Sequence, residues 1–395
     1  MRSTASRRPA LTEDWQEGGF GLYVHWPFCQ AKCPYCDFNS HVSRETDQDH
    51  WCRAYLSELD RYAAEVPGRV VTSVFFGGGT PSLMNPDVVG AILDRIARLW
   101  PMANAPEITL EANPSSVEAG RFRGYSTAGV NRVSMGIQAL NNRDLARLGR
   151  LHSVEEAYTA FDIARQNFSR VSFDLIYARQ GQTVQDWQKE LEQALAMAVD
   201  HLSLYQLTIE PGTAFGDRFA RGTLRGLPDE DETADMYLLT QDLCQAADLS
   251  GYEVSNHAAP GAESRHNMIY WRYGDFVGIG PGAHGRLTLD GQRHATVGHH
   301  APGAWLDAVD SGHGEATRDA IAPAQQADEF LMMGLRLSDG IALGRYRALS
   351  GHPLPCEKLS YLSGMGMIEV SGDTMRVTEK GRPLLNAITR ELLSG

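Results

Sequence analysis

The sequence predicts an α/β protein: a partial (β/α)6, TIM-like barrel followed by a small winged-helix-like C-terminal domain. Six short runs of β-branched and aromatic residues alternate with helix-like segments between residues 21 and 258. Such alternation indicates parallel strands joined by crossover helices. Six units are fewer than the eight that close a barrel, so we expect a partial one. Near the C-terminus, helix-like segments precede a hairpin pattern and a final helix, which is typical of a winged helix.

The six expected strands have the length and composition of buried strands. They are, in order, Leu22–Pro27, Val71–Phe76, Glu107–Ala112, Asn131–Ile137, Arg170–Tyr177 and His201–Leu207. After the fifth run, Thr183 and Asp186 have the spacing of a helix cap and precede apolar residues at helical spacing, which predicts a helix. Polar residues end most of these runs, so we expect a ligand cleft at that edge of the sheet.

Four segments are expected along the chain: a flexible tail at 1–20, the barrel at 21–258, a connecting segment at 259–317 and the C-terminal domain at 318–395. The connecting segment is rich in histidine and glycine. In the last segment, the letters SGDT at 371–374 predict a hairpin turn, and Thr378 is expected to cap a final helix. Its 9 basic and 9 acidic residues predict a packing or partner-binding module rather than a DNA-binding one.

Composition excludes several classes of protein. The net charge of −13 among 395 residues argues against nucleic acid as a partner. No apolar run approaches the roughly 20 residues of a membrane-spanning helix, and the N-terminus lacks the apolar core of a secretory signal. Cys52, Cys244 and Cys356 are too scattered for a disulfide framework. We therefore expect a cytoplasmic protein.

The segment FCQAKCPYCDF places Cys29, Cys33 and Cys36 on one loop after the first strand. Three thiolates can bind three irons of a [4Fe–4S] cluster and leave the fourth iron without a protein ligand. An open iron can chelate the amino and carboxylate groups of S-adenosylmethionine. Zinc remains an alternative, with His25 or His41 as the fourth ligand.

The cysteine spacing, with the aromatic Tyr35 before the last cysteine, resembles the signature of the radical S-adenosylmethionine superfamily. The letters GGGTPS at Gly77–Ser82 resemble its second signature, in which glycines let the backbone approach the ligand closely. Further blocks, among them YVHWPFC, EANP, GVNRVSMGIQ and HNMIYWRYGDFVGIGPGAHG, are similar to the HemN-related subgroup and, within it, to the HemW heme chaperone-like proteins. The similarity covers roughly residues 20–390.

The resemblance implies a radical S-adenosylmethionine barrel with the cluster on Cys29, Cys33 and Cys36. By position in the motifs, it also implies contacts to S-adenosylmethionine from Tyr23, Tyr35, Gly78, Gly79, Thr80, Glu111, Gln138, Arg150 and Asp174. The implied fold includes the C-terminal domain of the subgroup.

The HNxxYW letters, His266, Asn267, Tyr270 and Trp271, mark the HemW side of the subgroup and imply heme contact by His266, Tyr270 and Trp271. A histidine can ligate heme iron, and the two aromatic side chains offer flat apolar surface. His284 lies close to the expected cleft and could serve it instead. His299 and His300 fit a surface loop better than a metal site.

The function implied is to bind heme and deliver it to respiratory hemoproteins. Implied partners are heme, the recipient hemoprotein, an electron donor such as flavodoxin or ferredoxin, and a second copy in a homodimer, with peripheral membrane association through the recipient. The alternative is an oxygen-independent coproporphyrinogen III oxidase, or another radical enzyme acting on a porphyrin. The oxidases carry a further cysteine where this chain has Phe38, and a longer N-terminal arm, so we expect no oxidase activity.

Overall fold

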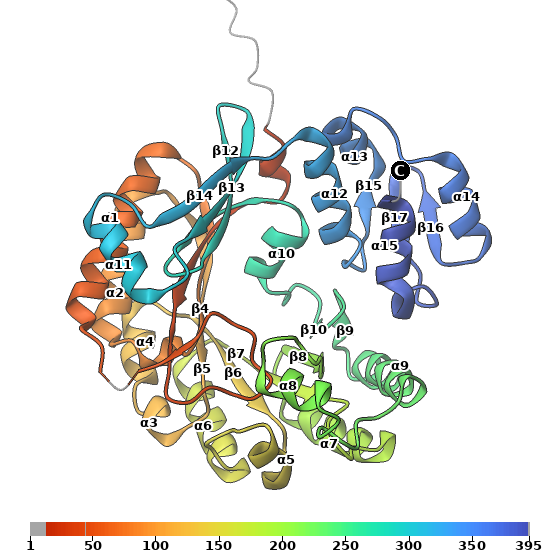
Figure 1. Cartoon of the computed structure of the whole chain (residues 1–395), viewed down its shortest axis with the longest axis horizontal. Coiled ribbons are helices and arrows are strands. Elements are labelled where there is room, and N and C mark those ends of the chain that lie inside the picture. Colours follow the sequence, from red (N-terminus) through yellow and green to blue (C-terminus); the bar gives the residue numbers. More distant parts are fainter. Residues whose placement is uncertain (1–12, 44, 394–395) are drawn as a thin grey trace, which may run out of the picture.

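The structure is a computed structural model that describes residues 13–43 and 45–393. Its barrel contains six parallel strands in chain order: β1 (Phe20–Trp26), β4 (Val71–Gly78), β5 (Met102–Ala112), β6 (Arg132–Gln138), β7 (Arg170–Tyr177) and β8 (His201–Gln206). Each of the six expected strands lies within or largely overlaps one of them. The predicted partial α/β barrel is confirmed (Figure 1).

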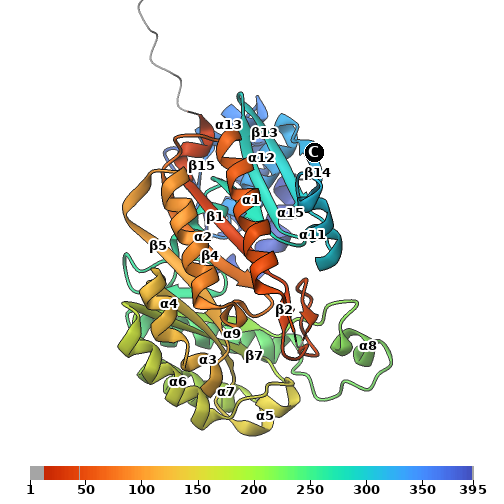
Figure 2. The same cartoon turned by 90° about the vertical axis from the view of Figure 1, so that its left-hand side faces the viewer.

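Amphipathic helices cover the outer face of these strands. The longer ones are α1 (Gln48–Glu65), α2 (Pro86–Leu99), α6 (Val154–Asn167), α7 (Val184–Met197) and α9 (Glu230–Ala246). Figure 2 shows α1 and α2 lying over β1 and β4. The predicted cap of α7 is confirmed, because the Thr183 hydroxyl accepts from the Asp186 amide and the Asp186 carboxylate accepts from the Thr183 amide. Strands buried on both faces and helices buried on one face produce a single large apolar core.

Shorter elements complete the barrel half of the chain. They are η1 (Asp14–Glu17), β2 (Phe28–Cys29), β3 (His41–Val42), η2 (Pro81–Leu83), α3 (Ser116–Ala119), α4 (Phe122–Ala128), α5 (Asn142–Arg147) and α8 (Ala214–Ala220). The tail expected at 1–20 lies mostly outside the described residues. Of the remainder, η1 is fixed by Arg345, whose guanidinium donates to the Asp14 carboxylate at 2.7 and 2.9 Å, and Phe20 already belongs to β1.

The sheet continues beyond the barrel on both edges. The segment at 259–317 contributes α10 (Arg265–Trp271), β11 (Asp275–Ile279), β12 (His284–Leu289), β13 (Gln292–Gly298) and α11 (Pro302–Asp310). Strand β11 pairs in parallel with β1, and β12, β13 and β14 (Glu315–Ala320) follow it antiparallel. On the other edge, β8 is followed by β10 (Asn256–Ala258) and β9 (Ser250–Gly251). The histidine-rich segment therefore extends the barrel sheet.

The C-terminal domain has its own apolar core. Its elements are α12 (Pro323–Gly334), β15 (Ile341–Ala342), α13 (Leu343–Ser350), α14 (Cys356–Gly364), β16 (Ile368–Ser371), β17 (Thr374–Val377), η3 (Arg382–Leu384) and α15 (Leu385–Leu393). The predicted hairpin joins β16 to β17. The predicted cap is wrong: Thr378 accepts from the Gly381 amide in a turn, and α15 begins only at Leu385, because η3 intervenes.

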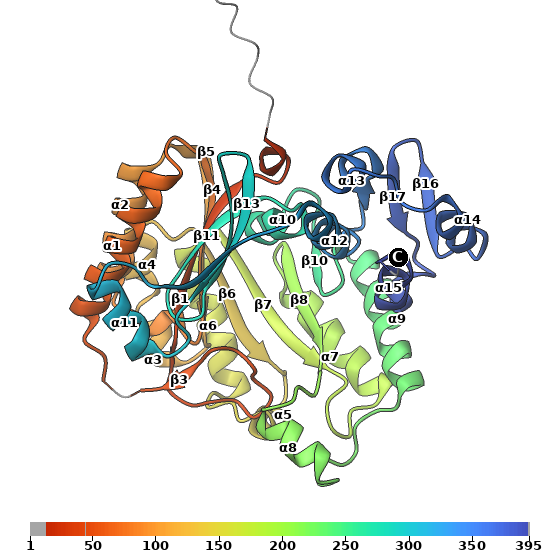
Figure 3. The ribbon, with the colours of Figure 1, turned by 45° about the horizontal axis from the view of Figure 1, so that its top comes forward.

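Helix α10 lies between the barrel and the C-terminal domain, in contact with β4 on one side and α12 on the other (Figure 3). Among the described residues, no helix is long and apolar enough to cross a membrane. The carboxyl ends of β1, β4, β5 and β6 meet at one edge of the sheet, where the loop that carries the three cysteines begins.

Candidate functional site: a cysteine pocket beside an aromatic cavity

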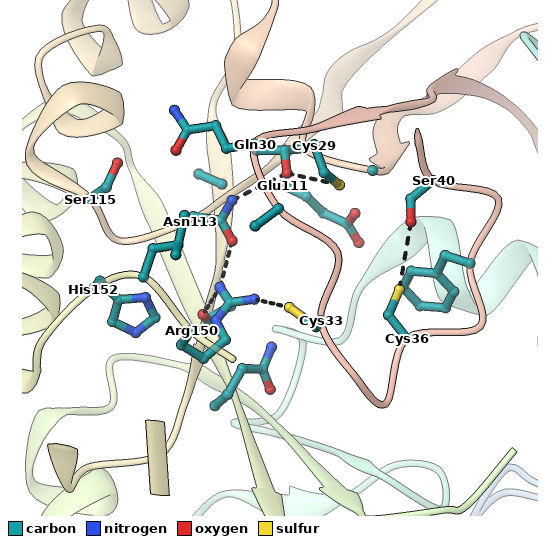
Figure 4. A pocket seen from close by; sticks show the side chains of 18 of the residues that line it. Cys29, Gln30, Cys33, Cys36, Ser40, Glu111, Asn113, Ser115, Arg150 and His152 are labelled. Atoms are coloured by element: carbon teal, nitrogen blue, oxygen red, sulfur yellow. Dashed lines mark hydrogen bonds between the residues drawn. The ribbon is translucent and has the colours of Figure 1, made fainter. Parts of the chain in front are cut away.

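The cysteine loop, residues 27–43, leaves the end of β1 and folds back on itself. Its short strands β2 and β3 pair in parallel, and the His41 amide donates to the Pro27 carbonyl at 2.7 Å. This closure gathers Cys29, Cys33 and Cys36 around one pocket (Figure 4). The cysteine pocket is lined by this loop, by residues at the ends of β4, β5 and β6, by Asp174 within β7, and by the segment between α5 and α6. Its lining includes Gly78, Gly79, Thr80, Glu111, Asn113, Gln138, Arg150 and Asp174.

Each of the three sulfur atoms has its own polar neighbour. The Thr80 hydroxyl donates to Cys29 Sγ at 3.4 Å, Arg150 Nη1 donates to Cys33 Sγ at 3.4 Å, and Ser40 Oγ lies 3.9 Å from Cys36 Sγ. Hydrogen bonds to cluster sulfurs are one of the means by which proteins set the properties of an iron–sulfur site.

Asn113 connects two of these neighbours. Its Nδ2 donates to the Thr80 hydroxyl at 3.2 Å, and its Oδ1 accepts from Arg150 Nη2 at 2.5 Å. The Glu118 carboxylate in turn accepts a hydrogen bond of 2.7 Å from the backbone N–H of Asn113. The polar groups that contact Cys29 and Cys33 therefore form one connected network, drawn in Figure 4.

The two histidines considered for a zinc site have other partners. The two ring nitrogens of His25 lie 3.0 Å from the Tyr23 hydroxyl and 2.9 Å from the Asn39 carbonyl, and His41 Nε2 lies 2.9 Å from Asn39 Oδ1. Within the two described ranges, no three potential metal-ligating side chains converge on one point. A cluster that presents a separate iron to each thiolate does not require them to converge.

The chemistry of the donor set fits an iron–sulfur cluster. Burial raises the pKa of the Cys29 and Cys36 thiols. Thiolates at these positions need positive charge nearby, which cluster irons provide. The Arg150 guanidinium is a protein cation in direct contact with one of the three sulfurs.

The glycines at the end of β4 pack against β1 and the cysteine loop. A Cβ atom on Gly79 would lie 2.7 Å from the Phe28 carbonyl oxygen, and one on Gly78 would lie 2.6 Å from the His25 ring. Gly78 also has φ +111°, which side-chain-bearing residues rarely adopt. These glycines therefore allow the end of β4 to contact the cysteine loop as well as to line the pocket.

Two carboxyl groups, Glu111 and Asp174, face the pocket from β5 and β7. Both residues are partly exposed, but their carboxyl groups are surrounded by protein. Burial, with repulsion from Asp174, raises the pKa of Glu111 to about 8, and burial raises that of Asp174 to about 6. Paired carboxyl groups in such a place fit a ligand with positive charge and hydroxyl groups. S-adenosylmethionine has an ammonium, a sulfonium and ribose hydroxyls.

Some residues that line this pocket carry buried polar atoms without a hydrogen-bond partner among the described residues. They include Gln138 Oε1 and Arg150 Nε. Gln138 has φ +73°, a strained conformation for a residue with a side chain. Such unsatisfied atoms are typical of a ligand site.

Eight of the nine residues expected to contact S-adenosylmethionine line the cysteine pocket: Tyr35, Gly78, Gly79, Thr80, Glu111, Gln138, Arg150 and Asp174. The ninth, Tyr23, lines a neighbouring cavity instead. Asn113 also lines this pocket; it stands in the EANP block, among the polar residues that end the expected strands, but it is not one of the nine expected contacts.

The neighbouring cavity, which we call the aromatic cavity, has a volume of about 630 Å³. Gly78, Glu111 and Phe38 line both this cavity and the cysteine pocket. The other walls come from β1, α10, β11, β12, α12 and the loop between β13 and α11, including Tyr23, His25, Tyr270, Trp271, Phe276, His284, Arg286, His300, Glu329 and Met333. The volume is in the range of sites for cofactor-sized ligands.

The HNxxYW letters form α10, which divides their side chains between two environments. Tyr270 and Trp271 line the aromatic cavity, as expected of residues that contact a macrocycle. His266 does not line it: the side chain is 1% exposed, Nδ1 lies 2.8 Å from Ser73 Oγ and Nε2 lies 2.6 Å from the Tyr270 hydroxyl. It stacks on Phe75 and contacts β4 rather than the cavity.

Comparison with known proteins agrees with this architecture. Residues 23–194 match the model of the radical SAM superfamily, and residues 321–384 match the HemN C-terminal domain. Coproporphyrinogen III oxidase (HemN) from Escherichia coli superposes with a TM-score of 0.80 over 95% of this chain and 90% of that one, at 21% identity. That likeness establishes the fold.

Curated relatives are similar over almost the whole chain. Heme chaperone HemW of Escherichia coli is 37% identical over 94% of this chain and 98% of its own length. Heme chaperone HemW of Mycobacterium tuberculosis is 35% identical, covering 95% of each. Radical S-adenosyl methionine domain-containing protein 1, mitochondrial, of Danio rerio is 40% identical over 81% of this chain and 73% of its own. The chain belongs to the HemW family of the radical S-adenosylmethionine superfamily.

Proposed function

We propose that this protein is a heme chaperone, which binds heme in the aromatic cavity and delivers it to respiratory hemoproteins. The observation that carries the proposal is the cavity itself, about 630 Å³ and walled by Tyr270, Trp271 and Phe276. Flat aromatic walls suit an apolar macrocycle. The names of its HemW relatives support the same function.

The proposal includes a [4Fe–4S] cluster on Cys29, Cys33 and Cys36, with S-adenosylmethionine in the cysteine pocket. When bound, the reduced cluster supplies an electron that can cleave the sulfonium bond. The chain's own residues hold and orient these groups. Thr80 and Arg150 donate hydrogen bonds to two of the cysteine sulfurs. Glu111 and Asp174, which line the pocket, would accept hydrogen bonds from the ligand's positively charged and hydroxyl groups.

A second candidate is a radical enzyme that acts on a porphyrin, such as an oxygen-independent coproporphyrinogen III oxidase. It is favoured by the wall that both cavities share, because a molecule beside Gly78 and Glu111 in the aromatic cavity would adjoin S-adenosylmethionine. Phe38, at the position where the oxidases carry a further cysteine, lines this wall and argues against oxidase activity. We therefore place the chaperone first.

One experiment separates the two functions. The cluster is reconstituted without oxygen, and either heme or coproporphyrinogen III is added with S-adenosylmethionine and a reductant. The chaperone predicts a stable Soret band in the difference spectrum, transfer of that heme to an apo-hemoprotein, and no decarboxylated porphyrin. Turnover of coproporphyrinogen to its divinyl product would overturn the chaperone and support the oxidase.

The proposal also includes protein partners. They are an electron donor such as flavodoxin or ferredoxin, a recipient respiratory hemoprotein through which the chain would associate peripherally with a membrane, and a second copy in a homodimer. Sedimentation velocity with and without heme measures whether the chain forms this homodimer.

A further inference from the structure

Three histidines line the aromatic cavity: His25, His284 and His300. This matters because a histidine nitrogen is a common protein ligand of heme iron. Imidazole binds iron through a nitrogen that carries no proton and is not occupied by another hydrogen-bond donor. The hydrogen bonds and the neighbours of each ring therefore indicate which histidine could bind iron in the cavity.

His25 and His266 are both fully engaged. His25 bridges the Tyr23 hydroxyl and the Asn39 carbonyl through its two nitrogens, which fixes its ring against the cysteine loop. His266 bridges Ser73 and Tyr270 and is buried against Phe75 outside the cavity. A bond from either histidine to iron would first break one of these hydrogen bonds.

His300 lies at the side of the cavity next to the cysteine loop. Its backbone carbonyl accepts a hydrogen bond of 2.8 Å from Asn39 Nδ2, and its ring lies edge-on to His41 with 6.4 Å between the ring centroids. The loop that carries it is therefore fixed. Its ring makes no hydrogen bond among the described residues, and what sets it apart from His284 is this contact with another imidazole.

His284 begins β12, and among the described residues its ring makes no hydrogen bond. It is exposed as a whole residue but forms part of the cavity wall. The aromatic side chains Tyr270 and Trp271 of α10 and Phe276 of β11, the strand next to β12, line the same cavity.

Arg286 adds a second feature that suits heme. Because residues two apart on a strand point to the same face, Arg286 and His284 project together from β12, and both line the cavity. Arg286 pairs with Glu329 of α12 at 3.1 and 3.2 Å. A heme propionate could share this guanidinium, since Arg can donate several hydrogen bonds in a planar fork.

We infer that His284 is the protein ligand of the heme iron in the aromatic cavity. This inference rests on the proposed function and deepens it, because it assigns the iron ligand to the start of β12 rather than to the HNxxYW segment. Tyr270 and Trp271 then contact the macrocycle, while His266 fixes the position of Tyr270 through the hydrogen bond to its hydroxyl.

The test is the electron paramagnetic resonance spectrum of ferric heme added to reconstituted protein whose cluster is oxidised and therefore silent. Variants H284A, H284C, H266A and H300A are compared with H313A, in which the lost side chain is exposed and lines neither cavity. We expect H284A to lose the wild-type heme signal, added imidazole to restore a nitrogen-ligated signal, and H284C to give a thiolate-ligated one. H313A and H300A should keep the wild-type spectrum.

The outcomes separate the inference from the proposed function. Heme bound by wild type with an unchanged spectrum in H284A, or a change of ligand in H266A or H300A alone, would overturn the assignment of His284 and leave the chaperone intact. Absence of any heme signal from wild type would instead overturn the proposed function. Equal iron and sulfide content in all variants shows that each has folded.

Discussion

Asn39 Nδ2 donates a hydrogen bond of 2.9 Å to the carbonyl oxygen of Pro281, 242 positions further along the chain. The same nitrogen donates to the His300 carbonyl at 2.8 Å, and Asn39 Oδ1 lies 2.9 Å from His41 Nε2. A single side chain thus joins the cysteine loop to the loop that precedes β12. The loop that forms the cysteine pocket is thereby held to residues that form the wall of the aromatic cavity.

Replacement of Asn39 by Ala should loosen this connection. Each lost hydrogen bond is worth about 1 kcal/mol, so we expect the free energy of unfolding to fall by about 2 to 3 kcal/mol. Heme should bind more weakly while the cluster is retained. Chemical denaturation and heme titration measure the two effects, with Asn104→Ala as the control because Asn104 is exposed. An Asn39 variant as stable as that control would contradict this role.

The carboxyl group of Glu111 should make stability depend on pH. Its pKa is raised from 4.5 to about 8, so between these values the unfolded chain loses this proton while the folded protein keeps it. The group's contribution to stability is therefore fully present below about pH 4.5 and is lost as the pH rises to about 8. Glu111→Gln removes this loss. Without S-adenosylmethionine, the free energy of unfolding of the variant should therefore exceed that of wild type by more at pH 8.5 than at pH 5.

Binding of S-adenosylmethionine should reverse that trend in the wild type. Because positive charge on the ligand favours the ionised carboxylate, affinity should rise with pH up to about 8. Thermal unfolding at the two pH values, with and without the ligand, measures both effects. If the stability difference between Glu111→Gln and wild type without the ligand were the same at both pH values, the raised pKa of Glu111 would be refuted.

Arg150 should influence the cluster as well as the ligand. Its guanidinium donates to Cys33 Sγ, to Asn113 Oδ1 and to the Gly136 carbonyl. Arg150→Ala removes a positive charge and a hydrogen bond from one sulfur, so the cluster should be harder to reduce. Redox titration against Arg98→Ala, an exposed arginine, measures the shift. An unchanged potential would mean that Arg150 acts only on the ligand or the fold.

The parallel core of the barrel could be read from the sequence because its strands are buried on both faces and are therefore continuous apolar runs. The strands β11 to β14 could not. Their residues include several glycines, histidines and arginines, and β14 is mostly exposed. The pairing of β11 with β1 places Phe20 beside Asp275, a relationship that no local pattern contains.

The gathering of Cys29, Cys33 and Cys36 around one pocket could be predicted, because the three cysteines follow one another closely on the loop after the first strand. The role of His266 could not be judged in this way. A seven-residue helix, α10, turns His266 toward Ser73 and Trp271 toward the cavity. Which face of a short helix is buried depends on β4 and α12, which are distant in sequence.

The measurement that tests the central claim most directly is the metal content of protein reconstituted without oxygen, together with the spectrum of its reduced form. A site on Cys29, Cys33 and Cys36 with one open iron predicts about four irons and four sulfides per chain, from the stoichiometry of such a cluster. It also predicts a reduced-cluster resonance that changes when S-adenosylmethionine is added. One tightly bound zinc without acid-labile sulfide, or a cluster signal indifferent to S-adenosylmethionine, would contradict it.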